Sequence, residues 1–141
     1  MKRTALLSLL IVFAVSTGFA QGTDNASGEK ENKPVIEFEK KTYNYGEINY
    51  KGDGICRFKF ENKGQEPLLL TKVRASCGCT TPSWPKEPIN PSDTASIEVK
   101  YNTRIKGNFS KSIRVYSNAK NSPILLRIKG KVVTESTASK E

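Results

Sequence analysis

The sequence predicts an all-β protein, folded as an antiparallel sandwich of about seven short strands. Apolar and charged residues alternate in several short segments, which is the period of a β-strand. Turn-forming residues separate these segments about every 8–15 residues, and no segment keeps a helical period. The stretch that carries the pattern, residues 34–133, has the length of an immunoglobulin-like domain, so we expect a sandwich of that kind. A closed barrel is the alternative all-β fold.

The strands are expected in this order along the chain. VIEFE and YNYGEI alternate weakly, and Gly52-Asp53-Gly54 after them is interpreted as a hairpin turn. GICRFKFEN then places Cys56, Phe58 and Phe60 on one face and charged residues on the other. PLLLTKVRAS is apolar over most of its length. The last three segments alternate again: TASIEVKYN, FSKSIRVYSN and PILLRIKGKVV.

The first twenty residues, MKRTALLSLLIVFAVSTGFA, have the features of a secretory signal peptide. Two basic residues precede an apolar run of about 11 residues, and Gly18-Phe19-Ala20 fits a cleavage site before Gln21. A membrane span needs about 20 apolar residues, so we expect none. Residues 21–33 are then a flexible linker and residues 134–141 a polar tail. We therefore expect an exported protein, located in the periplasm or outside a bacterial cell.

The net charge indicates which partners are plausible. Residues 1–20 carry two basic and no acidic residues, so cleavage changes the net charge from +9 to +7. A basic excess favours anionic partners such as lipid head groups, acidic glycans or nucleic acid. Export argues against nucleic acid, and the basic residues are scattered along strands, as in Arg127, Lys129 and Lys131. We interpret them as a solvated surface that protects the sheet edges from aggregation.

Between Phe58 and Gly130 the chain resembles a known family. The elements FKFEN, PLLLTKV, SCGCT, PINPS, GNFSK and YSN follow one another in this order. They are similar to the pattern of the bacterial family called Domain of Unknown Function 1573, with Ser92 where that family usually has glycine. The resemblance implies an immunoglobulin-like sandwich, similar to modules of ciliary and pilus-chaperone proteins, in an exported protein. It implies no established activity.

Three cysteines in an exported protein predict one disulfide and one remaining thiol. Cys77 and Cys79 flank a glycine in the loop that follows PLLLTKVRAS. Cys56 begins an antiparallel strand at the same end of the sandwich, so it could reach either of them. A bond between Cys77 and Cys79 would close a tight ring. The sequence therefore leaves all three pairings of Cys56, Cys77 and Cys79 open.

Cys77 and Cys79 also suggest two chemical alternatives. Thiolates bind Cu(I), and the nearby Arg74 and Lys86 would favour thiolates for disulfide exchange. The chain has no histidine, and its only methionine is Met1, so a zinc site with four ligands is not available. The lack of histidine also removes Ser-His-Asp and Cys-His catalysis. We therefore expect no enzyme, no catalytic residue and no cofactor, with Cys77 and Cys79 as the metal candidates.

The segment after the cysteines, TPSWPKEPINP, is the candidate binding loop. Its central residues are Trp84 and Pro85, and Arg74 and Lys86 are the charged candidates beside it. Four prolines restrict its backbone, so the loop should keep one shape. Trp84 is either an exposed anchor for a sugar ring or a partner protein, or a plug over the end of the sandwich. The Trp84-Pro85 bond is a candidate cis peptide.

Asp93-Thr94-Ala95 resembles the short O-glycosylation acceptor of Bacteroides-like bacteria, with Thr94 as the candidate attachment site. The alternative is that Asp93 and Thr94 only open a strand.

Together these features predict a non-catalytic exported immunoglobulin-like module that binds an envelope protein or a glycan. Two alternatives stay open. One is a Cu(I)-handling or thiol–disulfide protein that uses the Cys-Gly-Cys loop, and the other is a purely structural component of the envelope.

Overall fold

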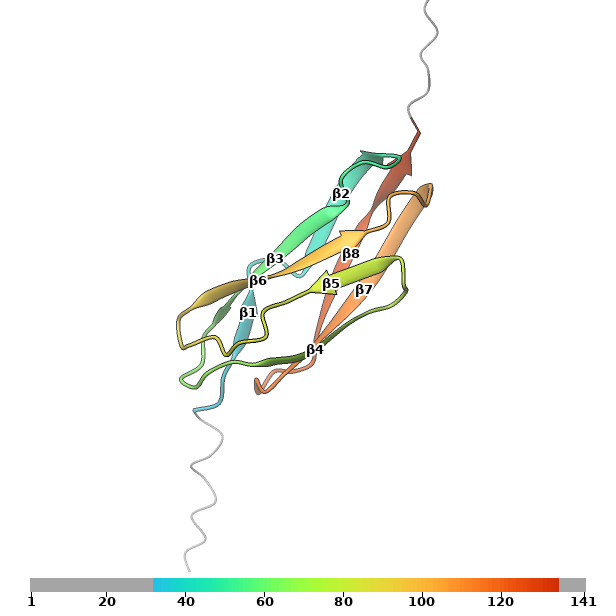
Figure 1. Ribbon diagram of the computed structural model, residues 1–141. Coiled ribbons are helices and arrows are strands. Elements are labelled where there is room, and N and C mark those ends of the chain that lie inside the picture. Colours follow the sequence, from blue (N-terminus) through green and yellow to red (C-terminus); the bar gives the residue numbers. More distant parts are fainter. Residues whose placement is uncertain (1–31, 135–141) are drawn as a thin grey trace, which may run out of the picture.

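Two four-stranded sheets face each other in the computed structural model, which describes residues 32–134 (Figure 1). Sheet A contains, in spatial order, β1 (Ile36–Phe38), β3 (Ile55–Asn62), β6 (Thr94–Tyr101) and β5 (Thr80–Ser83). Sheet B contains β2 (Thr42–Asn49), β8 (Ile124–Val133), β7 (Gly107–Ser117) and β4 (Leu70–Ala75). The predicted all-β sandwich is therefore confirmed.

Several expectations fall on other parts of the chain. The expected signal peptide, residues 1–20, lies outside the described residues, as do nearly all of the expected linker (21–33) and tail (134–141). Within residues 32–134 no helix is long and apolar enough to cross a membrane.

The alternating apolar residues place the core between the two sheets. Cys56, Phe58 and Phe60 of β3 point inward and are at most 4% exposed, as the sequence predicts. The rings of Phe38 and Phe60 lie 5.2 Å apart, which joins β1 to this cluster. The facing strands β7 and β8 contribute fully buried residues: Ile113, Val115, Leu126 and Ile128. Burial of each large apolar side chain contributes about 1.5–3 kcal/mol, so this layer holds the sandwich together.

Residues 32–134 form eight strands, and the one that the sequence did not indicate is β5. It consists of four residues in the segment that was expected to be an irregular loop. β5 pairs antiparallel with β6, and Thr81 lies opposite Lys100. Pro82 lacks a backbone N–H, which an edge strand tolerates. The proline-containing segment therefore begins as an edge of sheet A.

One pair of strands departs from the expected antiparallel arrangement. β2 runs parallel to β8, with Thr42 opposite Arg127 and Ile48 opposite Val132. The register shifts around Gly46, whose φ of 65° favours glycine. Because β1 pairs in sheet A and β2 in sheet B, the start of the domain crosses from one sheet to the other.

The interpretation of Gly52-Asp53-Gly54 as a hairpin turn is wrong, because this turn carries the chain from β2 in sheet B to β3 in sheet A. The N–H of Tyr101 donates to the Gly54 carbonyl at 2.9 Å. A Cβ on Gly54 would collide with the carbonyl of Tyr101, so only glycine lets the turn lie this close to the end of β6. The N–H of Asn102 in turn donates to the Cys79 carbonyl at 2.9 Å. The turn, the end of β6 and the cysteine loop therefore meet at one end of the sandwich.

Candidate functional site

The Cys-Gly-Cys loop carries the chain from β4 in sheet B to β5 in sheet A. Cys77 and Cys79 form a disulfide, with their Cα atoms 5.3 Å apart. The N–H of Thr80 donates to the Cys77 carbonyl at 3.4 Å, and the Thr80 hydroxyl oxygen lies 3.8 Å from each sulfur. A Cβ on Gly78 would meet no atom within 4 Å. The loop is thus held at its ends while its tip is open.

Cys56 is the remaining thiol, and it is buried in the core at 4% exposure. It lies at the same end of the sandwich as the disulfide, as expected, but of the three pairings left open the structure adopts Cys77–Cys79. Burial raises the pKa of the Cys56 thiol. The neighbouring Tyr45 hydroxyl donates to the Gly54 carbonyl at 2.7 Å, and burial, followed by its hydrogen bond with Cys56, raises the Tyr45 pKa.

The disulfide bears on the metal hypothesis. In this state neither Cys77 nor Cys79 offers a thiolate, which is the form that binds Cu(I). Within residues 32–134 no three or more His, Cys, Asp or Glu side chains are grouped as metal ligands. A Cu(I) site would therefore need the reduced pair.

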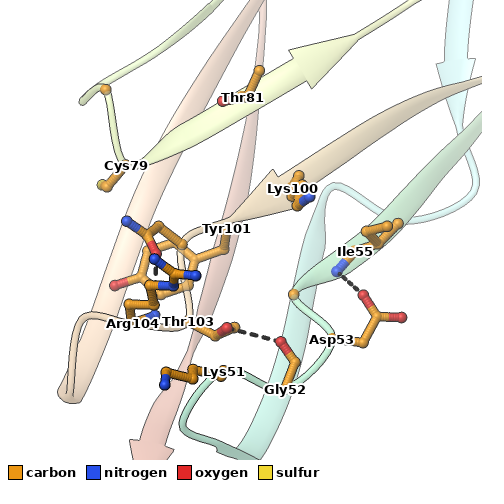
Figure 2. A pocket seen from close by; sticks show the side chains of 13 residues that line it. Lys51, Gly52, Asp53, Ile55, Cys79, Thr81, Lys100, Tyr101, Thr103 and Arg104 are labelled. Atoms are coloured by element: carbon orange, nitrogen blue, oxygen red, sulfur yellow. Dashed lines mark hydrogen bonds between the residues drawn. The ribbon is translucent and has the colours of Figure 1, made fainter.

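A hollow of about 700 Å³ opens beside the disulfide, at the end of the sandwich (Figure 2). Three elements give it a cationic lining: Lys51 comes from the β2–β3 turn, Lys100 from β6 and Arg104 from the β6–β7 connection. Cys79 forms part of the rim. Asp53 is the one carboxylate among the lining residues. The hollow is therefore basic, and the disulfide lies at its edge.

Internal hydrogen bonds occupy several of the other polar groups of this hollow (Figure 2). Asp53 Oδ1 accepts a bond from the N–H of Ile55 at 2.9 Å, and the Thr103 hydroxyl donates to the Gly52 carbonyl at 2.8 Å. Tyr101 is 2% exposed, and burial raises its pKa. The three cations form no ion pair with any residue of the described range. The arrangement can therefore hold an anionic group, with its single carboxylate already engaged.

The candidate binding loop does not present an open aromatic face. Trp84 is partly buried and packs against the core cluster, with its Nε1 buried and without a partner among residues 32–134. The Nζ of Lys86 lies 3.1 Å from the centre of the Trp84 ring and covers it. Pro85 is also half-buried. The expectation of a cis Trp84-Pro85 bond is wrong, because Ser122-Pro123 is the cis peptide in the described range.

Two further candidates lie away from the hollow. Arg74 is exposed on the outer face of sheet B, where it lies opposite Arg114 on β7. Thr94 is exposed at the start of β6 and pairs with Glu61, at the end of sheet A that is remote from the disulfide. Its position leaves room for a sugar, and its glycosylation stays a prediction.

The sequence reasoning missed the cations of the hollow. Lys51 is far from Lys100 and Arg104 in the sequence, and only the pairing of the strands brings it beside them. A partial signal was present, because Lys100 is the last charged residue of the alternating segment of β6 and Arg104 follows that segment, so both belong to the strand end nearest the cysteine loop.

Comparison with solved structures places this fold among sandwiches of varied origin. A protein of unknown function from Porphyromonas gingivalis W83 has a TM-score of 0.63 at 18% identity, over 77% of this chain and 50% of that chain, so this chain spans half its length. The ASH/PapD-like domain 7 of human CEP192 has a TM-score of 0.63 at 8% identity, over 95% of this chain and 100% of that chain. The secreted serine protease VesC from Vibrio cholerae has a TM-score of 0.53 at 10% identity, over 72% of this chain and 24% of that chain. These identities show a shared fold alone.

No curated protein matches the sequence. One family model does match it, "Protein of unknown function (DUF1573)", over residues 36–132, which includes all the strands of the sandwich except the last residue of β8. The resemblance drawn from the SCGCT element and its flanks is thereby confirmed, and the chain belongs to the DUF1573 family.

Proposed function

We propose that this chain is an exported, non-catalytic binding module of the bacterial envelope, and that it binds an acidic segment of a partner protein in the hollow beside the disulfide. The observation that carries the proposal is the set of three cations around the hollow, Lys51, Lys100 and Arg104, none of which has an ion-pair partner among residues 32–134. They line one hollow from three different elements, and a hollow lined by cations suits a carboxylate.

The chain composition supports a binding role over a catalytic one. Without histidine the chain lacks the usual general base near neutral pH. Asp53, the carboxylate in the hollow, accepts a backbone hydrogen bond and so serves the turn. The signal-peptide pattern of residues 1–20 supports export.

The closed edges of sheet A favour side-chain recognition over the addition of a strand. At β5, Pro82 has no N–H to offer, and the N–H of Thr80 already donates to the Cys77 carbonyl. At β1, the Asn121 side chain accepts from the N–H of Ile36 at 3.2 Å and donates to its carbonyl at 2.8 Å. A partner strand would have to displace these bonds.

The available aromatic groups favour a protein over a sugar at this site. Sugar rings are commonly held against an open aromatic face. Tyr101 in the hollow is buried, and Lys86 covers Trp84. An acidic peptide needs only the cations and the polar groups around them, such as the exposed Asn102.

A photo-crosslinking residue at Thr81, which lines the hollow, tests the proposal in the native host. A matched probe at Thr71 on β4 is the control, because Thr71 is also exposed but lies on the other sheet. We expect the Thr81 probe to capture a defined envelope protein from mature chain that begins at Gln21. The captured protein should be lost in the variant Lys100→Gln/Arg104→Gln.

Three results would count against the proposal. They are equal capture at Thr71, capture that persists in the charge variant, or a captured species that consists of glycan.

The disulfide at the rim supports one rival function, thiol–disulfide exchange. Cys79 lines the hollow, Gly78 leaves the loop tip open, and the nearby Lys100 and Arg104 would stabilise a thiolate if the bond were reduced. Incubation in glutathione buffers of graded potential tests this function. A disulfide that stays oxidised across the periplasmic and cytosolic range excludes it.

A further inference from the structure

The two outer faces of the sandwich differ in charge. On and beside the face of sheet A, cations and carboxylates are matched in ion pairs. Arg57 pairs with Glu98 at 2.6 Å, and Lys59 pairs with Glu39 at 2.9 Å. A third pair joins a lysine and a glutamate at the end of β3 at 2.7 Å. This face is therefore close to neutral over much of its area.

The outer face of sheet B is strongly cationic. Its four strands carry a single carboxylate, Glu47, which pairs with Lys131 at 3.0 Å. The outward and exposed cations of these strands are Lys72, Arg74, Arg114, Arg127, Lys129 and Lys131. Apart from Lys131, none of them has an ion-pair partner within residues 32–134. We call this set the cationic face.

Two arginines of the cationic face oppose each other directly. Arg74 of β4 and Arg114 of β7 are cross-strand neighbours, a placement in which like charges destabilise a sheet. A hollow of about 260 Å³ lies beside them, lined by the half-exposed Ser112 and Tyr116 and by Leu125, which is 47% exposed. The fold therefore keeps an unfavourable pair of like charges beside a small hollow that also has polar and apolar lining residues.

The cationic face continues from this pair along β8. Arg114 lies opposite Leu125, and Arg127 and Lys129 follow at alternate positions of the same strand. Alternate residues on one face of a strand are about 7 Å apart. The charges thus form a band that crosses β4 and β7 and then follows β8.

We propose that this cationic face binds an acidic polysaccharide. The guanidinium group of arginine can form two parallel hydrogen bonds with one carboxylate or sulfate group. The band presents cations at regular intervals, and a polysaccharide with a repeating acidic unit presents anions at regular intervals. The site is separate from the hollow beside the disulfide and shares no residue with it, so the two proposals stand independently.

Neutral polar groups between the cations favour a carbohydrate. Exposed hydroxyl and amide side chains accompany the charges on the same face: Thr42 and Asn44 on β2, and Asn108 and Ser110 on β7. These groups both donate and accept hydrogen bonds, as sugar hydroxyls require. A flexible polymer can use them together with the charges.

The twist of the sheet disfavours a bilayer surface as the ligand. Adjacent strands rotate by roughly 20–25° relative to one another, so a four-stranded face curves away from a plane. A flat layer of head groups would meet only part of the band at one time, whereas a flexible chain can follow all of it. The face also presents only one strongly exposed apolar residue, Leu125, for insertion into lipid.

Calorimetric titration of the mature chain with polygalacturonate and with dextran sulfate tests the proposal, with uncharged dextran as the blank. We expect both acidic polymers to bind and the variant Arg74→Gln/Arg114→Gln to weaken binding by about tenfold or more. The matched control is Arg57→Gln/Lys59→Gln, which removes the same charge from the opposite sheet and should stay within about twofold.

Two further measurements separate this proposal from a loss of folding and from the proposed binding site in the hollow. The thermal midpoint of Arg74→Gln/Arg114→Gln should not fall below that of the wild type, because a like-charge pair has been removed. Lys100→Gln/Arg104→Gln should bind the polysaccharides as the wild type does. The test of the cationic face therefore stays valid even if the hollow binds no acidic peptide.

Four results overturn the proposal. They are no binding to either acidic polymer at low salt, equal loss in both charge variants, a DNA duplex that binds as tightly as polygalacturonate, and phosphatidylglycerol vesicles that bind more tightly than both polymers.

Discussion

Cys56 is a buried group and Tyr45 a partly buried one, and the folded state disfavours the ionised forms of both. Burial raises the pKa of the Cys56 thiol above its usual 9.0, and burial also raises the pKa of Tyr45 above 10.0. Above about pH 9 the unfolded chain therefore loses protons that the folded chain retains. The free energy of unfolding should be constant for these groups below that pH and fall as the pH rises further. Urea midpoints at pH 7.5, 9 and 10 would measure the decline, with each group contributing at most about 1.4 kcal/mol per pH unit.

The variant Cys56→Ala separates the thiol from the tyrosine. It removes one titrating group, so its alkaline decline should be shallower than that of the wild type, although the lost sulfur lowers stability at every pH. A decline of unchanged slope would show that Cys56 ionises as easily when folded as when unfolded.

Single residues also show where the sequence was informative and where it was not. Alternation placed Cys56 on the inward face of its strand, and the structure confirms this. The same pattern could not select among three disulfide pairings, because the choice depends on how the loop from Cys77 to Cys79 closes on itself. Nor could it assign Trp84, because the packing of this ring against the core cluster depends on how its loop folds back onto the sandwich.

At the scale of elements, Asn62 fixes the end of β3 to two neighbouring segments. Its side chain is fully buried and donates to the carbonyls of Glu66 at 2.8 Å and Ile89 at 3.0 Å, while its oxygen accepts from the N–H of Gly64 at 3.0 Å. Both N–H donors of the Asn62 side-chain amide are therefore used within the fold.

The variant Asn62→Asp should lower the free energy of unfolding by about 3 kcal/mol or more. The carboxylate cannot donate, so the hydrogen bonds to the Glu66 and Ile89 carbonyls are lost and a charge is buried beside these two oxygens. Asn44→Asp is the matched control, because Asn44 is exposed and only accepts, from the N–H of Gly46, which a carboxylate also does. Denaturant unfolding would compare the two variants. Equal losses would mean that the buried amide contributes nothing specific.

The strands divide into those that local pattern reveals and those that it does not. Seven of them carry enough alternating or apolar residues to be predicted. β5 has only four residues and contains Pro82, so no local signal marks it, and its pairing with β6 alone makes it a strand. The parallel pairing of β2 with β8 and the crossing at Gly54 are likewise choices between distant segments.

At the scale of the whole molecule, contact surfaces lie on faces and at one end. Both edges of sheet A are capped, by Pro82 and by Asn121, and β2 is interrupted by the irregularity at Gly46. The two contact surfaces proposed above are the basic hollow at one end and the cationic face of sheet B. Composition gave the positive charge of the chain but not its segregation, because registers such as Arg74 opposite Arg114 decide which charges become neighbours.

The disulfide should contribute modestly to the stability of the whole domain. The two cysteines are separated by two positions in the sequence. For so short a loop, the loss of chain entropy in the unfolded state stabilises the fold by about 1.5 kcal/mol. The variant Cys77→Ser/Cys79→Ser should therefore remain folded, with a thermal midpoint lowered by several degrees.

Thiol titration checks the premise that Cys77 and Cys79 are joined in a disulfide. The wild type should show no rapidly reacting thiol when folded, because Cys56 is 4% exposed, and one when unfolded. Three thiols on unfolding would show that the pair is reduced, and a variant that fails to fold would show that the bond sustains the entire sandwich.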